Sequence, residues 1–300
     1  MGTSFMIKTL NKDDVLFDDA IEALRKLEGK ISDYLPDSEI SRINMMAGID
    51  FVPVSQEVLN LIEVSLAISK QSQGVFDPTL RPLLETWGFK ENLREFPSEE
   101  EISRVLKLIG WNKVIVEDDK IKLLDVGMKL DLGGIAKGYA VDKVIEVLKG
   151  AGVDNAIVEV GGDMYCLGSG LDFKGWRIGI RDPRFNSAII GKITVSDRGI
   201  ATSGNYENYF MYEGRKFSHI IDPRRGYPVQ NVIASVTIVS SECVTSDAWA
   251  TALSVVGWEE AQRIVESNLE LEAVLIKEFK GSIDVWVSSG LKENIEYYEN

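Results

Sequence analysis

The spacing of apolar residues changes near residue 114, and this change limits the folds open to the chain. Before that point apolar side chains recur mostly at three- and four-residue steps, the period of an amphipathic helix. We expect helices there over residues 13–31, 37–44, 55–72 and from Ser98 onward. Beyond it, β-rich runs and helical stretches are mixed without a regular βαβ repeat. This mixture predicts an α+β fold with a mostly antiparallel or mixed sheet and packed helices.

Local motifs set several element boundaries. Ser98 and Glu101, three residues apart, form a capping-box pattern at a helix start. Asp118-Asp119 separates two β-rich runs and predicts a hairpin. Further strands are expected at 156–160, 176–181, 189–195, 234–239, 271–277 and 282–287, and further helices at 134–148, 246–256 and 259–267. No repeat, low-complexity tract or clear linker appears, so we expect a single domain over residues 1–300.

Composition narrows the class of protein. With 45% hydrophobic and 27% charged residues, the 300-residue chain is typical of a globular protein with a sizeable core. Its formal net charge of -14 disfavours nucleic acid and anionic membranes as partners. The sequence contains no run of about 18 apolar residues, so it predicts no transmembrane helix. The two cysteines, Cys166 and Cys243, make neither a zinc site nor a disulfide framework, and their pairing stays open.

Two glycine-rich segments could approach a ligand closely. The segment from Asp131 to Gly138 leads into a predicted helix, whose free N–H groups and dipole favour a phosphate. Lys137 could add a positive charge there. The spacing matches neither a Walker loop nor G-x-G-x-x-G. The alternative is that these glycines only allow the helix start to pack closely against the rest of the protein. Gly161-Gly162-Asp163 after a strand is likewise either a tight turn or a point of ligand approach.

Three polar side chains are candidates for chemistry. His219 is the only histidine and could transfer a proton near neutral pH, although a structural histidine fits the same pattern. Asp247 and Thr251 stand four apart on a predicted helix and therefore share one face. A carboxylate and a hydroxyl are hard oxygen ligands suited to Mg²⁺. An aspartate that only caps a helix N-terminus would show the same spacing.

Taken together, these segments resemble the ApbE family of FAD:protein FMN transferases. The resemblance depends on a series of motifs in order along nearly the whole chain. They are Met1-Gly-Thr3, Tyr34-x-x-x-Ser38-x-x-Ser-Arg-x-Asn44, Phe76-Asp-Pro-Thr79, Pro82-Leu83 to Trp87-Gly-Phe89, Asp131-Leu-Gly-Gly-Ile-Ala-Lys-Gly-Tyr-Ala-Val-Asp142, Val160-Gly-Gly-Asp163, Thr202-Ser-Gly-Asn-Tyr206, Ser218-His-Ile-Ile-Asp-Pro223 and Asp247-Ala-Trp-Ala-Thr-Ala252. Each motif is weak alone, but the ordered series is specific.

The resemblance implies an enzyme that splits the pyrophosphate of FAD. It would leave FMN on a Ser or Thr hydroxyl of an acceptor protein and release AMP, with Mg²⁺ as the metal. By position, His219 matches the general base. The metal ligands matched are the Gly134 main-chain oxygen, Asp247 and Thr251. The FAD contacts matched are Met1, Tyr34 against the flavin ring, Val75, Phe76, Asp77, Asp131, Lys137 and Ile221.

The resemblance also carries expectations about partner and location. Family acceptors are typically subunits of membrane redox complexes. Family members usually begin with a lipoprotein signal peptide, whereas here the Met-Gly-Thr motif stands at residue 1. We expect a lipid-anchored protein on the periplasmic side of the cell envelope with its signal segment missing, or a cytoplasmic protein if Met1 is the natural start. The alternatives in function are an FAD-binding or delivery protein without turnover, and an FAD pyrophosphatase giving FMN and AMP.

Overall fold

The structure of the chain, a computed structural model, describes residues 2–9, 14–90, 96–170, 172, 174–185, 188–205 and 208–298. Contacts divide the chain into two compact units. Unit 1 comprises residues 1–25, 137–206 and 231–300, and unit 2 comprises residues 26–136 and 207–230. Each unit is assembled from segments that are separate in the sequence. The single domain expected over residues 1–300 stays a prediction.

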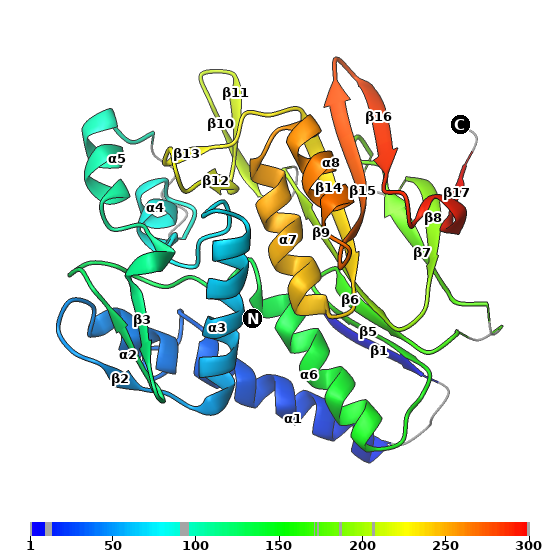
Figure 1. Cartoon of the computed structure of the whole chain (residues 1–300), viewed down its shortest axis with the longest axis horizontal. Coiled ribbons are helices and arrows are strands. Elements are labelled where there is room, and N and C mark those ends of the chain that lie inside the picture. Colours follow the sequence, from blue (N-terminus) through cyan, green and yellow to red (C-terminus); the bar gives the residue numbers. More distant parts are fainter. Residues whose placement is uncertain are drawn as a thin grey trace. The chain divides into compact units, whose positions relative to one another are not determined.

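Unit 1 is built on a seven-stranded sheet (Figure 1). Its spatial order is β1 (Phe5–Thr9), β5 (Ala156–Val160), β6 (Asp163–Leu167), β9 (Arg198–Gly204), β14 (Ile233–Ser240), β15 (Glu272–Phe279) and β16 (Ser282–Val287). Every neighbouring pair in this order is antiparallel. The predicted α+β class with a mostly antiparallel sheet is therefore confirmed.

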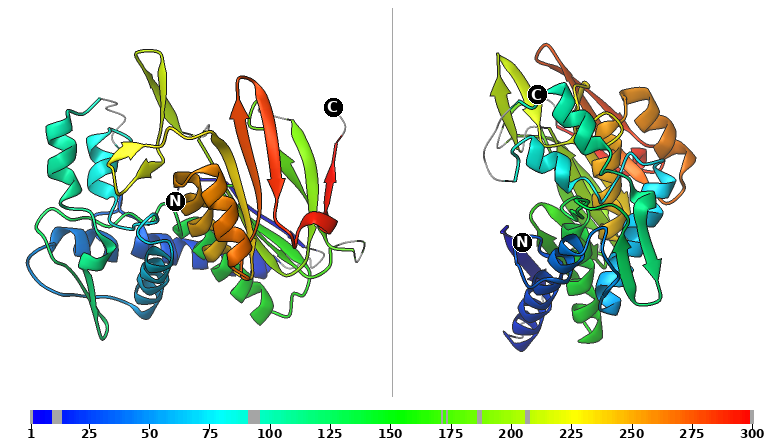
Figure 2. Two further views of the ribbon diagram at one scale, coloured as in Figure 1. Left: turned by 45° about the horizontal axis from the view of Figure 1, so that its top comes forward. Right: turned by 90° about the vertical axis from the view of Figure 1, so that its left-hand side faces the viewer.

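The two faces of this sheet are covered differently. One face packs on helices, among them α1 (Asp14–Ile31), α6 (Ala136–Gly150), α7 (Cys243–Val255) and α8 (Trp258–Ser267), as Figure 2 shows for α7 and α8. The other face packs on a three-stranded sheet of β17 (Ile295–Tyr297), β8 (Ile189–Val195) and β7 (Trp176–Arg181). A short 3-10 helix, η2 (Lys292–Asn294), precedes β17.

Successive side chains of β5 point alternately into two hydrophobic cores, one on each face of the sheet. Ala156 and Val158 point to the helical core, whereas Ile157 points to the core between the sheets. Successive side chains of a strand face opposite sides, so one strand serves both layers. Cys243 lies in the helical core and Cys166 in the other core, and both are free thiols. The open question of their pairing is therefore answered against a disulfide.

Unit 2 combines short helices with small antiparallel sheets. Its helices are α2 (Glu39–Met45), α3 (Gln56–Gln71), α4 (Arg81–Thr86), α5 (Glu99–Leu106) and the 3-10 turn η1 (Trp111–Lys113). A three-stranded sheet has the order β2 (Val52–Pro53), β4 (Lys120–Leu123), β3 (Val114–Glu117). Two strand pairs complete it: β10 (Tyr209–Tyr212) with β11 (Arg215–Ser218), and β12 (Ile221–Asp222) with β13 (Tyr227–Pro228).

The core of unit 2 forms around Trp87, which is fully buried. The rings of Phe217, Tyr227 and Phe210 lie 5.9, 5.8 and 6.4 Å from it. Its indole Nε1 donates a hydrogen bond of 2.8 Å to the carbonyl of Gly226. Aromatic residues from 207–230 thus complete a core whose central residue belongs to 26–136.

The sequence predicted the local motifs and the strands β5, β14, β15 and β16, but it missed β6 and β9. The Ser98–Glu101 capping box and the hairpin around Asp118-Asp119 are both present. The polar segment 201–204, which lies outside the strands expected from the sequence, belongs to β9, between β6 and β14. Ala and Gly are depleted in strands, so pairing with a strand on each side, more than local preference, decides this one.

Candidate active site

The first turns of α6 and α7 lie in unusually close contact within unit 1. A β-carbon on Gly138 would overlap the carbonyl oxygen of Cys243, and one on Gly199 would overlap its backbone nitrogen. The start of α7 is therefore held between two glycines, one on α6 and one on β9. Glycine at both positions permits this approach, because any larger residue would push α7 away.

Each of these helices offers a carboxylate to the other's N-terminus. Asp247 on α7 accepts a 3.0 Å hydrogen bond from the Gly138 N–H of α6. Asp142 on α6 accepts bonds of 2.9 and 2.8 Å from the N–H groups of Cys243 and Val244 on α7. These N–H groups have no partner within their own helices, and the helix dipole favours a negative charge there. The two carboxylates therefore lock the helices together in one register.

Burial raises the pKa of Asp142 to about 7, even though its two backbone donors lower it. The two hydrogen bonds stabilise the ionised form of Asp142, whereas burial destabilises it. Asp142 was not among the predicted site residues, although it is the last residue of the longest motif shared with the ApbE family.

Lys137, in the first turn of α6, lies between two buried carboxylates. Its Nζ is 2.5 Å from Asp163 Oδ2 and 2.9 Å from Asp247 Oδ1. The two carboxylates are 2% and 3% exposed in their side chains, whereas Lys137 is 33% exposed. Burial lowers the pKa of Lys137, but the charges of Asp247 and Asp163 outweigh it and raise that pKa. For Asp163 the sequence allowed either a tight turn or a point of ligand approach; in the structure it follows the Gly161-Gly162 turn and pairs with Lys137, and a ligand contact there stays a prediction.

Thr251 lies one helical turn after Asp247 on α7, so the predicted pair shares a face. Its Oγ1 is 3.4 Å from Ser203 Oγ on β9. On the same strand, the Thr202 N–H approaches Asp163 Oδ1 at 3.4 Å. Oxygen atoms from α7, β6 and β9 therefore converge beside the lysine.

This donor set fits a divalent cation such as Mg²⁺. Hard oxygen atoms are present, and two buried carboxyl groups share the ammonium of Lys137. Among the described residues there is no cluster of three or more His, Cys, Asp or Glu side chains able to hold a metal. A cation here would need hydroxyl, main-chain, water or substrate oxygens as well. Gly134, the predicted main-chain ligand, belongs to unit 2 and lies in the turn before α6.

His219 directly follows β11 in unit 2. Its ring Nδ1 is 3.0 Å from the carbonyl oxygen of Asn208, and its backbone N–H donates to the same oxygen at 2.9 Å. A carbonyl can only accept, so this contact favours the proton on Nδ1 and the lone pair on Nε2. The arrangement suits a general base that acts through Nε2.

Tyr34 is 65% exposed, as expected of a ring that would lie against a flat ligand. Lys90 Nζ and Arg81 Cζ lie 4.9 and 5.5 Å from the centre of its ring. Lys90 also forms ion pairs with Asp131 and Asp33, the latter at 3.0 Å. Tyr34 and Asp131, two predicted FAD contacts 97 residues apart, are thus connected through a lysine that the sequence reasoning missed.

The other predicted FAD contacts in unit 2 are buried. Val75 and Phe76 are 7% and 3% exposed, and Ile221 lies in the Trp87 core at 2%. Asp77 accepts hydrogen bonds from the Thr79 backbone and hydroxyl and from the Trp111 N–H. Its carboxylate therefore braces the loop before α4, and a ligand contact there would fall on main-chain atoms. Met1 lies outside the described residues.

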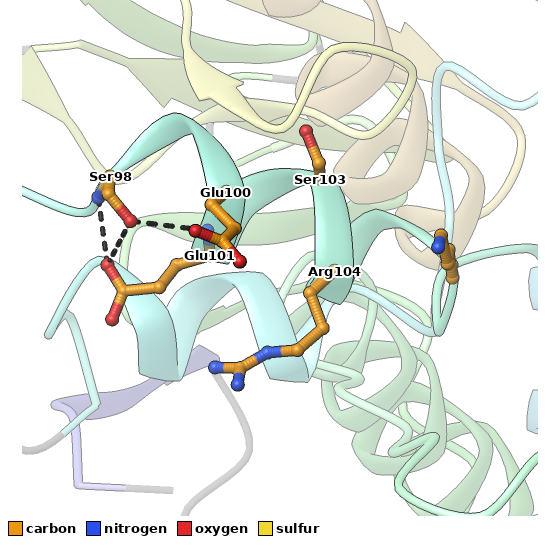
Figure 3. A pocket seen from close by; sticks show the side chains of 6 residues that line it. Ser98, Glu100, Glu101, Ser103 and Arg104 are labelled. Atoms are coloured by element: carbon orange, nitrogen blue, oxygen red, sulfur yellow. Dashed lines mark hydrogen bonds between the residues drawn. The ribbon is translucent and has the colours of Figure 1, made fainter.

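A surface hollow on α5 contains none of these residues. Figure 3 shows it bounded by Ser98, Glu100, Glu101, Ser103 and Arg104, with Lys107 completing the lining. The visible hydrogen bonds are those of the capping box between Ser98 and Glu101. The hollow is polar, open and explained by the start of one helix, so we assign no function to it.

Comparison with known proteins gives one family. The sequence model of the ApbE family matches residues 1–275. The FAD:protein FMN transferase of Vibrio cholerae is 31% identical over 300 aligned residues, covering 97% of this chain and 90% of that protein. That of Escherichia coli K12 is 29% identical, covering 87% and 76%.

Solved structures agree with the sequence match. The flavin transferase ApbE from Vibrio cholerae superposes with a TM-score of 0.89 at 30% identity, covering 98% of this chain and 96% of that one. The apo form of Pseudomonas stutzeri flavinyl transferase ApbE gives 0.88 at 32% identity, covering 98% and 94%. The predicted enzyme class, a transferase, is confirmed by these relatives. From the whole-chain match in both sequence and fold, we conclude that this chain belongs to the ApbE family.

Proposed function

We propose that this chain transfers the FMN half of FAD to a Ser or Thr hydroxyl of an acceptor protein. The acceptor oxygen bonds to the phosphorus of the FMN half, the bridging P–O bond breaks, and AMP leaves. The hydroxyl proton passes to the protein. The observation that carries the proposal is the oxygen-rich group around Lys137 in a chain whose relatives are named FAD:protein FMN transferases.

Asp247 and Thr251, with the main-chain oxygen of Gly134, are the residues we propose to hold Mg²⁺. The support is the buried Asp247 carboxylate and the second buried carboxyl group, that of Asp163, with which it shares Lys137. A bound Mg²⁺ supplies charge stabilisation to pyrophosphate oxygens. Lys137 adds a positive charge to the same region, which suits an anionic substrate.

His219 is the residue we propose as general base. Its Nδ1 contact with the Asn208 carbonyl supports the tautomer in which Nδ1 carries the proton and Nε2 is the accepting nitrogen. Phosphoryl transfer depends mainly on positioning and charge stabilisation, and a base contributes by orienting and deprotonating the nucleophile.

The FAD contacts are proposed on the same basis. Tyr34 offers an exposed ring to the flavin, and Asp131 lies at the head of the glycine-rich turn. The hydroxyl of Ser218 also supports a ligand near His219. It is 3% exposed and has no hydrogen-bond partner among the described residues. A buried hydroxyl without a partner is unfavourable by about 1–3 kcal/mol, which a ligand could relieve.

The test is incubation of the purified chain with FAD, Mg²⁺ and an acceptor domain from a flavinylated redox protein. We expect the acceptor to gain the mass of FMN less one water, with an equal amount of AMP. AMP formed equally with and without acceptor, and no adduct, would indicate a pyrophosphatase. FAD binding with neither product would indicate a binding or delivery protein.

We further propose a membrane redox-complex subunit as the acceptor and the cell envelope as the location. Among the described residues no helix is long and apolar enough to span a bilayer. Fractionation of cells carrying the full gene checks the location. Mass spectrometry of membrane subunits in cells lacking the gene should reveal the acceptor as the one that loses FMN.

A further inference from the structure

Two buried carboxylates compete for one lysine at the proposed metal site. Lys137 Nζ contacts Asp163 and Asp247 at once, from β6 and α7 respectively. Burial and the charge of Asp247 raise the pKa of Asp163, while Lys137 opposes both. Each carboxylate therefore depends on the same cation for its compensation.

A divalent cation on Asp247 would conflict with this arrangement. The ammonium lies 2.9 Å from Asp247 Oδ1, which is the oxygen a metal could use, because Oδ2 already accepts the Gly138 N–H. Two cations at one oxygen repel each other strongly where solvent is scarce. Lys137 must therefore leave Asp247 while staying close enough to act on a substrate.

Asp163 is built to keep the lysine in place. It begins β6, directly after the Gly161-Gly162 turn, and pairs with Val160 in the sheet. Both glycines have positive φ, 59° and 93°, so the turn is tight. A β-carbon on Gly161 would lie 3.3 Å from Lys137 Cδ, so the lysine stem runs against this turn.

We propose that Asp163 is a positioning residue that holds Lys137 when Asp247 binds the divalent cation. Lys137 then occupies the cation position on Asp247 only while the metal is absent. This inference rests on the metal site of the proposed function. It assigns a role at that site to Asp163 and another to Lys137. Asp163 lowers the competition of the lysine for Asp247, and Lys137 is the group that competes.

The test is direct binding of Mn²⁺, measured by electron paramagnetic resonance without FAD and with saturating FAD. Asp163→Asn leaves Asp247 as the remaining carboxylate partner of Lys137, so Mn²⁺ should bind about tenfold more weakly. Lys137→Met removes the competitor, so Mn²⁺ should bind about tenfold more tightly in the absence of FAD. Glu146→Gln, which removes an exposed charge from the same helix, should bind like wild type.

The double variant Lys137→Met with Asp163→Asn separates positioning from direct ligation. If Asp163 acts through the lysine, the double variant should recover at least wild-type affinity without FAD. Affinity as weak as in Asp163→Asn alone would make Asp163 a ligand and overturn the proposal. The comparison of these two variants decides the question even if Lys137→Met alone fails to fold.

Two other outcomes are distinct. If both single variants shift Mn²⁺ affinity in the same direction, the proposed competition is wrong although the metal site stands. If the wild-type protein binds no Mn²⁺ with or without FAD, the metal site of the proposed function fails, and this inference fails with it.

Discussion

Asp142 shows how one side chain can set the position of distant site residues. Its carboxylate binds two N–H groups at the start of α7, the helix that carries Asp247 and Thr251. Burial raises its pKa from the ordinary 3.8 to about 7. The folded state therefore holds a proton on Asp142 more tightly than the unfolded state does between these pH values.

This pKa gives a signed prediction for stability. With more protons bound in the folded state, the contribution of Asp142 to stability is complete below pH 3.8 and is lost as the pH rises through about 7. Asp142→Asn should remove that decline, so its stability should fall less than that of wild type from pH 4 to pH 7. Urea unfolding at several pH values measures this. Glu117→Gln, on the exposed end of β3, should retain the wild-type slope; an unchanged slope in Asp142→Asn would refute the prediction.

His219 provides a second test at the residue scale. His219→Ala should slow FMN transfer by about 10²–10⁴-fold, the range typical of a lost general base. FAD affinity, measured by flavin fluorescence, should stay near that of wild type, because the proposed role concerns the acceptor proton. A large loss of FAD affinity with little effect on the transfer step would move His219 to the binding site.

At the scale of elements, the contact between α6 and α7 is the feature on which the site depends. Gly138 and Gly199 allow the start of α7 to lie against backbone on both sides. The carboxylates of Asp142 and Asp247 then bond across this contact in opposite directions. Close packing and helix capping together fix the register of α7 relative to Lys137.

Gly138→Ala tests this contact. The added methyl would overlap the Cys243 carbonyl, so we expect a loss of about 1–3 kcal/mol in the free energy of unfolding. Gly29→Ala is the matched control: Gly29 lies in α1 with nothing near its missing β-carbon. That substitution should stabilise the protein by about 0.5–1 kcal/mol. Denaturant unfolding measures both, and equal effects would argue against the close approach.

At the scale of the whole molecule, neither compact unit is one continuous stretch of chain. Unit 1 uses three segments and unit 2 uses two. The Trp87 core of unit 2 needs Phe210, Phe217 and Ile221 from its second segment. Folding of unit 2 therefore requires residues more than a hundred positions apart in the sequence.

A fragment of residues 26–136 should accordingly fail to fold alone. Without Phe210 and Phe217, Trp87 loses ring partners that lie 6.4 and 5.9 Å away, and near-ultraviolet circular dichroism should show no ordered tryptophan signal. Joining residues 207–230 to the fragment through a flexible linker should restore the signal and a cooperative unfolding transition. Cooperative unfolding of the short fragment by itself would contradict this prediction.

Sequence alone predicted features whose causes lie within a few residues. The Ser98–Glu101 capping box, the Asp118-Asp119 hairpin and the apolar faces of α1 and α3 follow from local spacing. The ordered motifs also indicated the family, and with it His219, Asp247 and Thr251 as candidates. The start of α7 was placed three residues late, because its capping carboxylate comes from Asp142 on another helix.

Tertiary structure decided the features that depend on residues far apart in the chain. The polar strand β9 exists because β6 and β14 pair with it on both sides. Asp163, Lys137 and Asp247 meet although 26 and 110 residues separate the lysine from its partners. No local sequence pattern indicates that these three side chains are in contact. The stability of a buried charged group depends on its desolvation and on partners that only folding brings close to it.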